Sequence, residues 1–240
     1  EPSSRKYPAI ILTSEREAGD QILHINNMSK SLDGEKLFSN LNLNVTKGDK
    51  IALISKNDLA TSALYEILNG FSESDTGDFK FGQTITTGYL PNENEKFFND
   101  QQSLIDWLRQ FSSNKDEVYI RGFLGKMLFS GEETFKMANV LSGGEKVRCM
   151  ISRMMLKGGN FLMLDEPTNH LDLESIQAFN NALINFPGTV IFTCHDHHFT
   201  QTVANRIVEI TPNGCLDKLM TFDEYISSPK IKEQKEILLK

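Results

Sequence analysis

The sequence predicts an α/β fold with a parallel core sheet that helices cover on both faces. From residue 140 onward, helical patterns alternate with short, fully apolar segments, which is typical of buried parallel strands. The chain of 240 residues is 39% hydrophobic and 24% charged, which is enough for one domain with a substantial core. This composition excludes a disordered, collagen-like or disulfide-stapled protein.

The first half of the chain begins with strand patterns. Apolar or alternating stretches predict strands over residues 21–26, 41–45 and 50–54. Residues 61–68 have the pattern of a helix, which the following Asn-Gly pair ends, because glycine tolerates the backbone conformation that closes helices. Residues 76–90 are interrupted by glycines and are expected to be strand.

The rest of the chain is predicted to alternate between helices and strands. Leu104, Trp107 and Leu108 share one face of an expected helix, so we assign Trp107 to the core rather than to a ligand site. Helices are predicted over residues 103–111, 117–128, 143–156 and 174–184. Apolar strands are predicted over residues 160–164 and 188–193.

Charge, hydropathy and cysteine usage exclude several classes of protein. The formal net charge of −7 argues against binding nucleic acid by bulk charge, although a local basic segment could still contact phosphates. No apolar run approaches the roughly 20 residues that cross a bilayer. Cys149, Cys194 and Cys215 are scattered and form neither a disulfide framework nor a zinc motif. We therefore expect a cytoplasmic protein without a membrane partner.

Two adjacent acids follow the apolar strand that ends at Leu164. Asp165 and Glu166 should emerge at the carboxyl edge of the sheet, where α/β proteins bind their ligands. One carboxylate there can hold Mg²⁺ on a nucleotide, and the next can orient or deprotonate water. Two acids at a strand end are usually just solvated, but the Pro-Thr-Asn-His-Leu-Asp run that follows makes this pair specific.

A Ser-Gly-Gly motif precedes the helix predicted over residues 143–156. Ser142 can cap this helix, and the two glycines let backbone N–H groups approach an anion that the helix dipole also attracts. A plain capped helix is the alternative interpretation. The position of the motif shortly before the apolar strand and its acids favours the anion site. The full motif consists of Leu141, Ser142, Gly143, Gly144 and Glu145.

A histidine follows the last apolar strand. His195 could contact a γ-phosphate and detect its loss, whereas a lone histidine is more often structural. It should lie beside Asp165 and Glu166 if the strands that precede them are neighbours in the sheet. No role is predicted for His24, His197 or His198.

These motifs, in this order, resemble those of an ATP-binding-cassette (ABC) ATPase. Residues 141–145 resemble its signature, residues 164–172 its Walker B motif and D-loop, and residues 194–196 its switch histidine. The Asp-Glu-Pro-Thr-Asn-His-Leu-Asp form is similar to the ABC-F class, whose soluble twin-cassette proteins act on the ribosome. The Pro-Ser-Ser-Arg opening and residues 222–226 resemble the second cassette of the YbiT-like branch. The D-loop then comprises Asn169, His170, Leu171 and Asp172.

The resemblance covers nearly the whole chain and implies an ABC-type P-loop ATPase domain. Such a domain joins the parallel core sheet to an antiparallel β subdomain and a helical subdomain that carries the signature. The tail of an inter-cassette linker is then expected at residues 1–19, where the chain opens with two prolines and no secretory signal, although a cloning artefact or frayed terminus would look the same. The cassette is expected at residues 20–228, its helical subdomain at about 100–157, and a C-terminal extension at 229–240.

The phosphate loop departs from the family pattern. A cassette carries Gly-x-x-x-x-Gly-Lys-Ser/Thr after an early strand, but alignment places Ser55 at the first glycine, Ala60 at the second and Thr61 at the lysine. Asn57 and Ser62 keep the expected character, Ser62 as the hydroxyl that binds Mg²⁺. The degenerate motif comprises Ser55, Lys56, Asn57, Asp58, Leu59, Ala60, Thr61, Ser62 and Ala63.

These departures predict weak nucleotide binding. Thr61 cannot supply the charge-assisted contact to the phosphates, worth about 1.5–3 kcal/mol. Asp58 and Ala60 each cost about 1–3 kcal/mol if their positions need a positive φ. Leu32 replaces the aromatic residue that stacks on adenine, and Asn92 replaces the glutamine of the Q-loop. Any two of these terms imply roughly 10²–10⁴-fold weaker binding. Lys56 carries a charge, but its place in the loop directs it elsewhere.

The resemblance implies ATP and Mg²⁺ as ligands. In the family, two cassettes dimerise head to tail, so the signature would serve the ATP of the partner cassette. If ATP enters this cassette's own site, Glu166 would polarise water, Asp165 and Ser62 would hold Mg²⁺, and His195 would steady the γ-phosphate.

Three hypotheses follow. In the leading one, the chain is the C-terminal cassette of an ABC-F ATPase, with the N-terminal cassette of the same protein and the ribosome as partners. Ribosomal RNA would be met through the linker, of which only Arg5, Lys6 and Arg16 remain as basic residues. The second hypothesis is a non-catalytic pseudo-ATPase half. The third, a transporter ATPase subunit, is disfavoured because Asn169-His170 stands where transporter cassettes usually differ.

Overall fold

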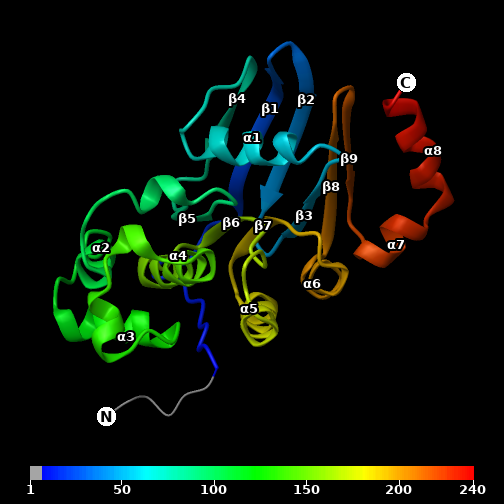
Figure 1. Cartoon of the computed structure of the whole chain (residues 1–240). Helices are drawn as coiled ribbons and strands as arrows, with labels where there is room; N and C mark the ends of the chain where they lie inside the picture. Colours follow the sequence, from blue (N-terminus) through cyan, green and yellow to red (C-terminus); the bar gives the residue numbers. More distant parts are fainter. Residues whose placement is uncertain (1–6) are drawn as a thin grey trace.

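The computed structural model describes residues 7–240 and is built around a mostly parallel six-stranded sheet of order β5-β6-β7-β3-β8-β9 (Figure 1). Arg5, Lys6 and the Pro-Ser-Ser-Arg opening lie outside the described residues. The parallel strands are β3 (Lys50–Ile54), β5 (Thr87–Leu90), β6 (Phe161–Asp165), β7 (Thr189–Thr193) and β8 (Arg206–Thr211). The edge strand β9 (Gly214–Lys218) pairs antiparallel with β8.

A second, antiparallel sheet of order β2-β1-β4 stands beside the first (Figure 1). Its strands are β1 (Gln21–Leu32), β2 (Glu35–Thr46) and β4 (Thr76–Phe81). The strand expected over residues 76–90 is present as two strands, β4 and β5, which belong to different sheets. The break includes Gly82, where an added Cβ would lie 1.9 Å from the carbonyl oxygen of Gln21, so the two backbones meet where only glycine fits.

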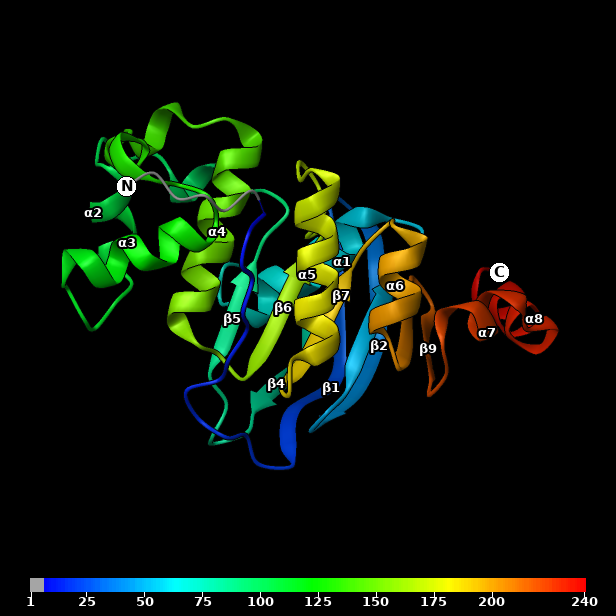
Figure 2. The same cartoon turned by 90° about the horizontal axis from the view of Figure 1, so that it is seen from below.

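Alternation along the central strands builds a core on each face of the parallel sheet. On β6, Phe161 and Met163 pack toward the antiparallel sheet, whereas Leu162 and Leu164 pack toward the opposite face. Helix α1 (Asp58–Leu68) fills the space between the two sheets. Figure 2 shows the other face, which is covered by α4 (Gly143–Lys157), α5 (Leu173–Asn185) and α6 (His197–Val203).

A helical lobe projects from the side of the sheet (Figure 1). Trp107 is fully buried in this lobe, stacks on Phe98 at 4.8 Å between ring centroids, and donates its indole N–H to the carbonyl of Phe97. The assignment of Trp107 to the core is therefore confirmed. Besides α4, the lobe contains α2 (Leu104–Arg109), α3 (Glu117–Lys126), η1 (Glu95–Phe97), η2 (Gly131–Phe135) and η3 (Ala138–Val140).

The end of the chain holds elements that the sequence patterns did not predict: α6, β8, β9, α7 (Phe222–Ser227) and α8 (Pro229–Leu238). Strand β8 is fully buried yet carries two charges, which hide its apolar pattern. Arg206 pairs with Asp49 at 2.7 Å and with Asp217 at 2.6 Å. Glu209 accepts a hydrogen bond from Tyr225 and pairs with Lys235 at 2.8 Å. The burial of these charges is possible because each has a partner.

The described part of the N-terminal segment, residues 7–19, lies against the helices (Figure 2). The amide of Ala9 donates to the carbonyl of Lys126 at 2.7 Å, and the amide of Glu15 donates to that of Gly158 at 2.9 Å. Ile10 and Leu12 join the hydrophobic core. Within residues 7–240, no helix combines the length and the apolar character that a membrane span requires.

Candidate functional site

The motifs singled out in the sequence meet at the carboxyl edge of the parallel sheet. Strands β6 and β7 are neighbours, and Asp165 is paired with Thr193. The amide of Glu166 donates to the carbonyl of Thr193 at 2.8 Å, and the amide of His195 donates to Glu166 Oε2 at 3.3 Å. This pairing brings His195 to the two acids, as strand adjacency requires.

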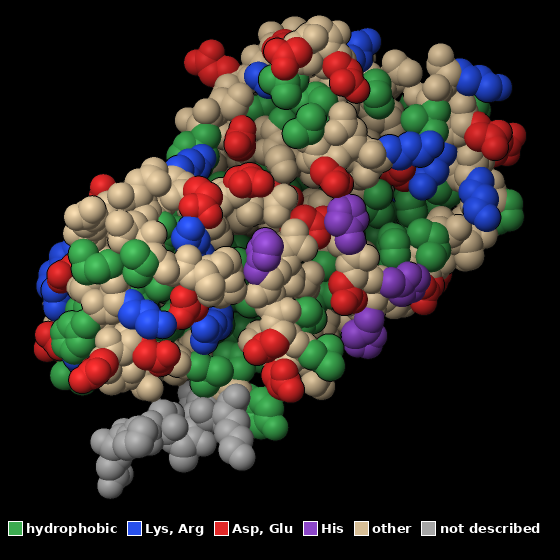
Figure 3. Space-filling view, viewed as in Figure 1, with side chains coloured by type: hydrophobic (Ala, Val, Ile, Leu, Met, Phe, Trp, Pro, Cys, Tyr) green, Lys and Arg blue, Asp and Glu red, His purple; other side chains and the backbone are tan. Residues whose placement is uncertain are grey.

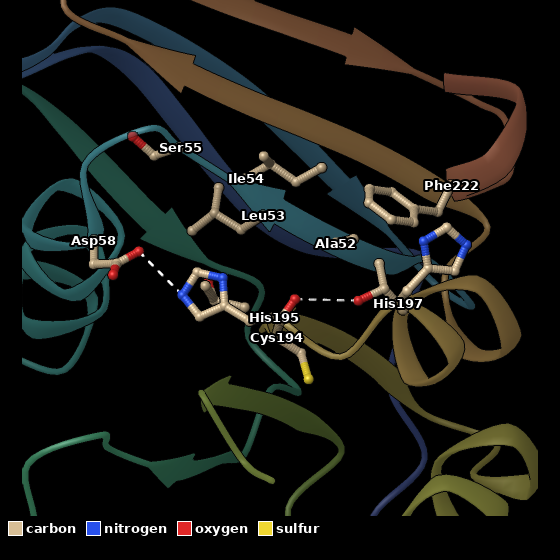
Figure 4. A pocket seen from close by; sticks show the side chains of 11 residues that line it. Ala52, Leu53, Ile54, Ser55, Asp58, Cys194, His195, His197 and Phe222 are labelled. Carbon is tan, nitrogen blue, oxygen red and sulfur yellow. Dashed lines mark hydrogen bonds and ion pairs between the residues drawn. The ribbon is translucent and has the colours of Figure 1, made fainter. Parts of the chain in front are cut away.

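His195 lies between two carboxylates. Its Nε2 atom is 3.1 Å from Glu166 Oε1. The same atom is 3.3 Å from an oxygen of Asp58, which comes from the first turn of α1 (Figure 4). Asp58 and His195 line a pocket of about 230 Å³ beside the strand ends, together with His197, Phe222 and other residues. These are ion-pair contacts rather than hydrogen bonds, because Glu166 Oε1 is buried without a hydrogen-bond partner. The imidazole can therefore serve as a donor to an incoming anion.

Glu166 is held in a costly conformation. Its φ is +53°, which is strained for a residue with a side chain, and it is only 7% exposed. Burial raises the pKa of its carboxyl, while the charge of His195 and the hydrogen bond from its backbone lower it. Strain and burial of this kind concentrate at functional sites.

A hydroxyl and a carboxylate converge next to Glu166. Ser62 Oγ donates to Asp165 Oδ2 at 2.6 Å, so both oxygens point at one place. Burial raises the pKa of Asp165 to about 6, and the Ser62 hydrogen bond opposes that rise. A hydroxyl and a carboxylate oxygen are suitable ligands for Mg²⁺ that arrives with phosphate oxygens. Among residues 7–240, no cluster of three or more His, Cys, Asp or Glu could hold a metal by itself.

The phosphate loop is satisfied internally. The amide of Asn57 donates to Ser55 Oγ at 3.1 Å, and Asn57 Oδ1 accepts from the amide of Leu59 at 3.0 Å, which caps α1. Thr61, at the position of the lysine, is 1% exposed and donates to the carbonyl of Asp58. Three donors of the loop that could meet a phosphate are thus already engaged, and no cation occupies the lysine position.

Two expectations for this loop need correction. The helix begins at Asp58 rather than residue 61, because the Asn57 cap starts it one turn early. The backbone cost expected at Asp58 and Ala60 required a positive φ, but both residues lie in α1 and neither has one. The departure from glycine therefore acts through the Asp58 side chain rather than through backbone strain.

The surroundings of Asp165 are acidic. Asp58, Glu66 and Glu93 all raise the pKa of Asp165 through their negative charges. Figure 3 shows acidic side chains around the middle of this face, with histidines among and below them. An incoming polyphosphate meets repulsion here unless a cation accompanies it.

The signature residues form the N-terminus of α4. Ser142 Oγ accepts from the amide of Glu145, whose carboxylate accepts in return from the amide of Ser142 at 2.8 Å, a complete capping box. Ser142 and Gly143 are exposed. An added Cβ on Gly144 would lie 2.9 Å from the carbonyl oxygen of His170, so glycine permits the D-loop to approach. Leu141, in contrast, is buried in the core.

Of the remaining predicted residues, some contact other residues of the site and others only support the fold. Asn169 Nδ2 donates to Asn92 Oδ1 at 3.2 Å, which joins the D-loop to the Q-loop position. Asp172 caps α5 by accepting from the amide of Ser175 at 2.8 Å, and Leu171 packs against the core.

Three other positions stay apart from this network. Leu32 ends β1 and is 45% exposed. Lys56 is exposed and makes no ion pair within residues 7–240. Ala63 belongs to α1 and packs at the edge of the core.

Sequence reasoning missed some of the site. The contact of Asp58 with His195 was not foreseen, although an acid inside a phosphate loop is itself the signal. Tyr65 shares a hydrogen bond with Thr193 Oγ1 at 3.0 Å beneath the acids, and no sequence pattern indicated this pairing.

Comparison with known proteins agrees with this geometry. A model of the ABC transporter family matches residues 38–169. The chain is 52% identical to the uncharacterized ABC transporter ATP-binding protein YkpA of Bacillus subtilis, with 97% of this chain and 44% of that protein covered. It is 36% identical to the probable ATP-binding protein YbiT of Escherichia coli O157:H7, with 96% and 44% covered. Identity to the energy-dependent translational throttle protein EttA of Escherichia coli K12 is 30%, with 82% and 36% covered. The chain thus spans less than half the length of these relatives.

Solved structures share the fold. A dimeric ATP-binding cassette in a post-hydrolysis state, bound to ADP and phosphate, superposes with a TM-score of 0.70 at 15% identity, covering 83% of this chain and 99% of that chain. An ATP-binding subunit of an ABC transporter superposes with a TM-score of 0.71 at 17% identity, covering 91% and 100%. The predicted α/β class with parallel core sheet, antiparallel β subdomain and helical subdomain is confirmed. Since the family model matches more than half of its residues, the chain belongs to the ABC transporter family, as an ATP-binding cassette.

Proposed function

We propose that this chain is the C-terminal cassette of a twin-cassette ABC-F ATPase that acts on the ribosome in translation. In this proposal its own nucleotide site has a degenerate Walker A motif, while its signature completes the ATP site of the N-terminal cassette. The observation that carries the proposal is the division of the site: the acids and His195 are assembled, whereas the phosphate loop has no cation and is closed by its own hydrogen bonds. The relatives, each more than twice as long as the chain, include one named for translation.

The chemistry of the chain's own site follows from the contacts around β6. Mg²⁺, when bound with ATP, supplies positive charge that offsets the phosphates, and Ser62 and Asp165 would hold it. Glu166 would accept a hydrogen bond from a water and orient it, and His195 would donate to the γ-phosphate. The pKa of about 6 keeps most Asp165 carboxyls ionised at neutral pH, as metal binding requires.

The phosphate side opposes binding. Thr61 is buried and uncharged where a lysine normally meets the phosphates. Asp58 places a carboxylate 3.3 Å from His195 Nε2, so it competes with phosphate for this donor. Both effects predict ATP affinity well below that of an intact cassette.

Calorimetry tests the degenerate site. We expect Mg-ATP to bind this chain with a dissociation constant above about 100 μM, from a typical cassette affinity reduced by one charged contact and one added repulsion. Low-micromolar affinity would contradict the degenerate-site proposal. Glu166→Gln should leave this weak binding unchanged, because Glu166 would act on water rather than on the nucleotide.

The signature is tested in the full-length twin-cassette protein. Ser142→Ala should lower its ATPase rate by at least about tenfold, because Ser142 would donate to the partner's ATP. Ser130→Ala is a matched control, since Ser130 forms a similar capping box at η2, in the same lobe but outside the signature. An equal loss in both variants would show that Ser142 acts only through folding.

Ribosome binding has its own experiment. Full-length protein carrying Glu166→Gln, with the equivalent change in the other cassette, should sediment with ribosomes through a sucrose cushion in the presence of ATP. Protein that stays in the supernatant under these conditions would contradict the translation role while leaving the cassette assignment intact.

One observation favours the non-catalytic alternative. The Asp58 carboxylate lies 3.3 Å from His195 Nε2, on the side where a phosphate would otherwise approach. A chain that serves only its partner would show no heat of Mg-ATP binding at millimolar concentration. In that case Glu166→Gln on this cassette alone would leave the ATPase rate of the full-length protein unchanged.

A further inference from the structure

A second pocket lies at the edge strand β5, away from the phosphate loop. It has a volume of about 180 Å³ and shares no lining residue with the pocket beside His195. Its walls come from the end of α1, β5, the turn η1 and the C-terminal half of α4. The lining residues used below are Phe71, Tyr89, Phe97, Arg153 and Lys157.

Arg153 reaches this pocket as a cation without a counter-ion. Its Nε and Nη1 atoms are enclosed and have no hydrogen-bond partner, and the part of the chain that the structure describes offers it no acid. Burial alone lowers the pKa of Arg153. An enclosed guanidinium normally pairs with an anion, because its desolvation is otherwise uncompensated.

Aromatic rings hold the guanidinium in place. Its central carbon lies 4.9 Å from the ring centroid of Phe97 and 4.4 Å from that of Phe111. These cation–π contacts fix the plane of the fork but satisfy none of its N–H donors. The enclosed donors thus remain without a polar partner.

A second cation stands one helical turn further along α4. Lys157 is four residues after Arg153, and burial first, then the charge of Arg153, lower its pKa. Two like charges at this spacing repel each other. Lys96 adds positive charge nearby, with its Nζ atom 3.7 Å from the centroid of Phe71. An anion between Arg153 and Lys157 would relieve this repulsion.

Arg148, on the same helix, is the residue with which Arg153 can be compared. It also lies over a ring, 4.8 Å from the centroid of Phe129, but it donates to the carbonyl of Met127 at 3.2 Å. A cation–π contact therefore does not require an arginine of α4 to lack a polar partner. Arg153 thus differs from Arg148 on the same helix in having no polar partner for its enclosed nitrogen atoms.

We propose that the pocket binds a small oxyanion, a carboxylate or phosphate group, between Arg153 and Lys157. The planar fork of Arg153 matches two oxygens of either group, and Lys157 supplies a second charge at the mouth. Phe71, Tyr89 and Phe97 form the wall against which the rest of the ligand lies, which favours an anion with a flat apolar body. This site is independent of ATP and of the proposed function.

The fluorescence of Trp107 can report ligand binding in the pocket, because Trp107 contacts the two aromatic residues that hold Arg153. It is the one tryptophan of the sequence, its indole donates to the carbonyl of Phe97 at 2.7 Å, and its ring contacts Phe111. The folded chain is titrated with inorganic phosphate in one arm and with benzoate in the other, at constant ionic strength. We expect a saturable change in Trp107 fluorescence in at least one arm, and that arm identifies the group. The absence of a saturable change in both arms would overturn the proposal.

Variants locate the binding. Arg153→Met should abolish the change, and Lys157→Met should weaken binding at least tenfold. Arg148→Met, the matched control on α4, should bind as the parent does, and so should Ser62→Ala, which excludes the phosphate loop as the source. If Arg153→Met does not fold by circular dichroism, Arg153→Lys replaces it and should bind at least tenfold more weakly. Unchanged binding in a folded Arg153 variant would contradict the assignment.

Discussion

The N-termini of α1 and α4 have the same kind of cap but differ in the residues that follow it. Each helix begins with a side-chain cap, Asn57 for α1 and Ser142 for α4. At α4 the cap is followed by two glycines, and Ser142 and Gly143 are exposed. At α1 the next residue is Asp58, whose carboxylate contacts His195. The N-terminus of α4 is thus open to an anion, whereas the N-terminus of α1 already contains the carboxylate of Asp58.

The difference shows which part of the cassette has changed. Glu166 keeps a strained backbone and Asp165 keeps a buried carboxyl with a raised pKa, and both features cost folding free energy. They persist next to a loop that lacks its lysine. In the function proposed above, the departures from the family pattern lie in the phosphate loop, at Leu32 and at Asn92, and they do not extend to the acids at the strand end.

The largest effect is expected from a variant that gives the phosphate loop at α1 the residues of the family pattern. The triple variant Asp58→Gly, Ala60→Gly, Thr61→Lys restores the phosphate loop and should raise Mg-ATP affinity about 100-fold, or about 2.7 kcal/mol. Calorimetry measures it, and Lys56→Ala is the control, because Lys56 makes no contact that would replace the missing charge. An unchanged affinity in a folded triple variant would remove the loop from the explanation.

A pH-dependent effect of intermediate size concerns Asp165. Its pKa rises from 3.8 to about 6 on folding, so ionisation of the folded protein costs stability above pH 6 and nothing below pH 4. Asp165→Asn should therefore stabilise the fold by about 3 kcal/mol at pH 8, and the gain should vanish by pH 4. Urea unfolding across this range measures it.

Asp172 is the control for this pH profile. Its pKa is lowered, mainly by the hydrogen bond with Ser175, so Asp172→Asn should reduce stability at neutral pH. That loss should shrink as the pH falls below the usual range of an aspartate. If both variants changed the stability in the same direction at neutral pH, the raised pKa that burial gives Asp165 would be contradicted.

The smallest effect compares the caps themselves. Asn57→Ala and Ser142→Ala should each destabilise the chain by about 1 kcal/mol, since each removes one capping hydrogen bond. Chemical unfolding at neutral pH tests this equality. In the full-length protein only Ser142→Ala should also lower the ATPase rate. An equal functional loss from Asn57→Ala would abolish the asymmetry between the two helix ends.

Sequence patterns predicted the interior of the sheet well. Strand β3 was expected over residues 50–54 and has these bounds, because an apolar stretch between turns has few alternatives. The meeting of His195 with Asp165 and Glu166 followed from the adjacency of β6 and β7. The order of the motifs and the positions of the strand ends were sufficient to predict this part of the site.

The failures have physical causes. Strand β8 was missed because its buried Arg206 and Glu209 are neutralised by partners distant in sequence. The role of Asp58 depends on where α1 begins relative to β7, which no local pattern specifies. The glycine cost assumed the backbone of an intact phosphate loop, whereas this loop winds into helix one turn earlier.

The N-terminal segment has a mechanical consequence. It is fastened at Ala9 to the end of α3 and at Glu15 to Gly158, the left-handed residue that ends α4. An added Cβ on Gly158 would lie 2.6 Å from Glu15 Cγ, so the second fastening is tight. A pull on residues 9–15 would therefore load the C-terminal end of α4, the helix whose N-terminal end carries Ser142 and Gly143.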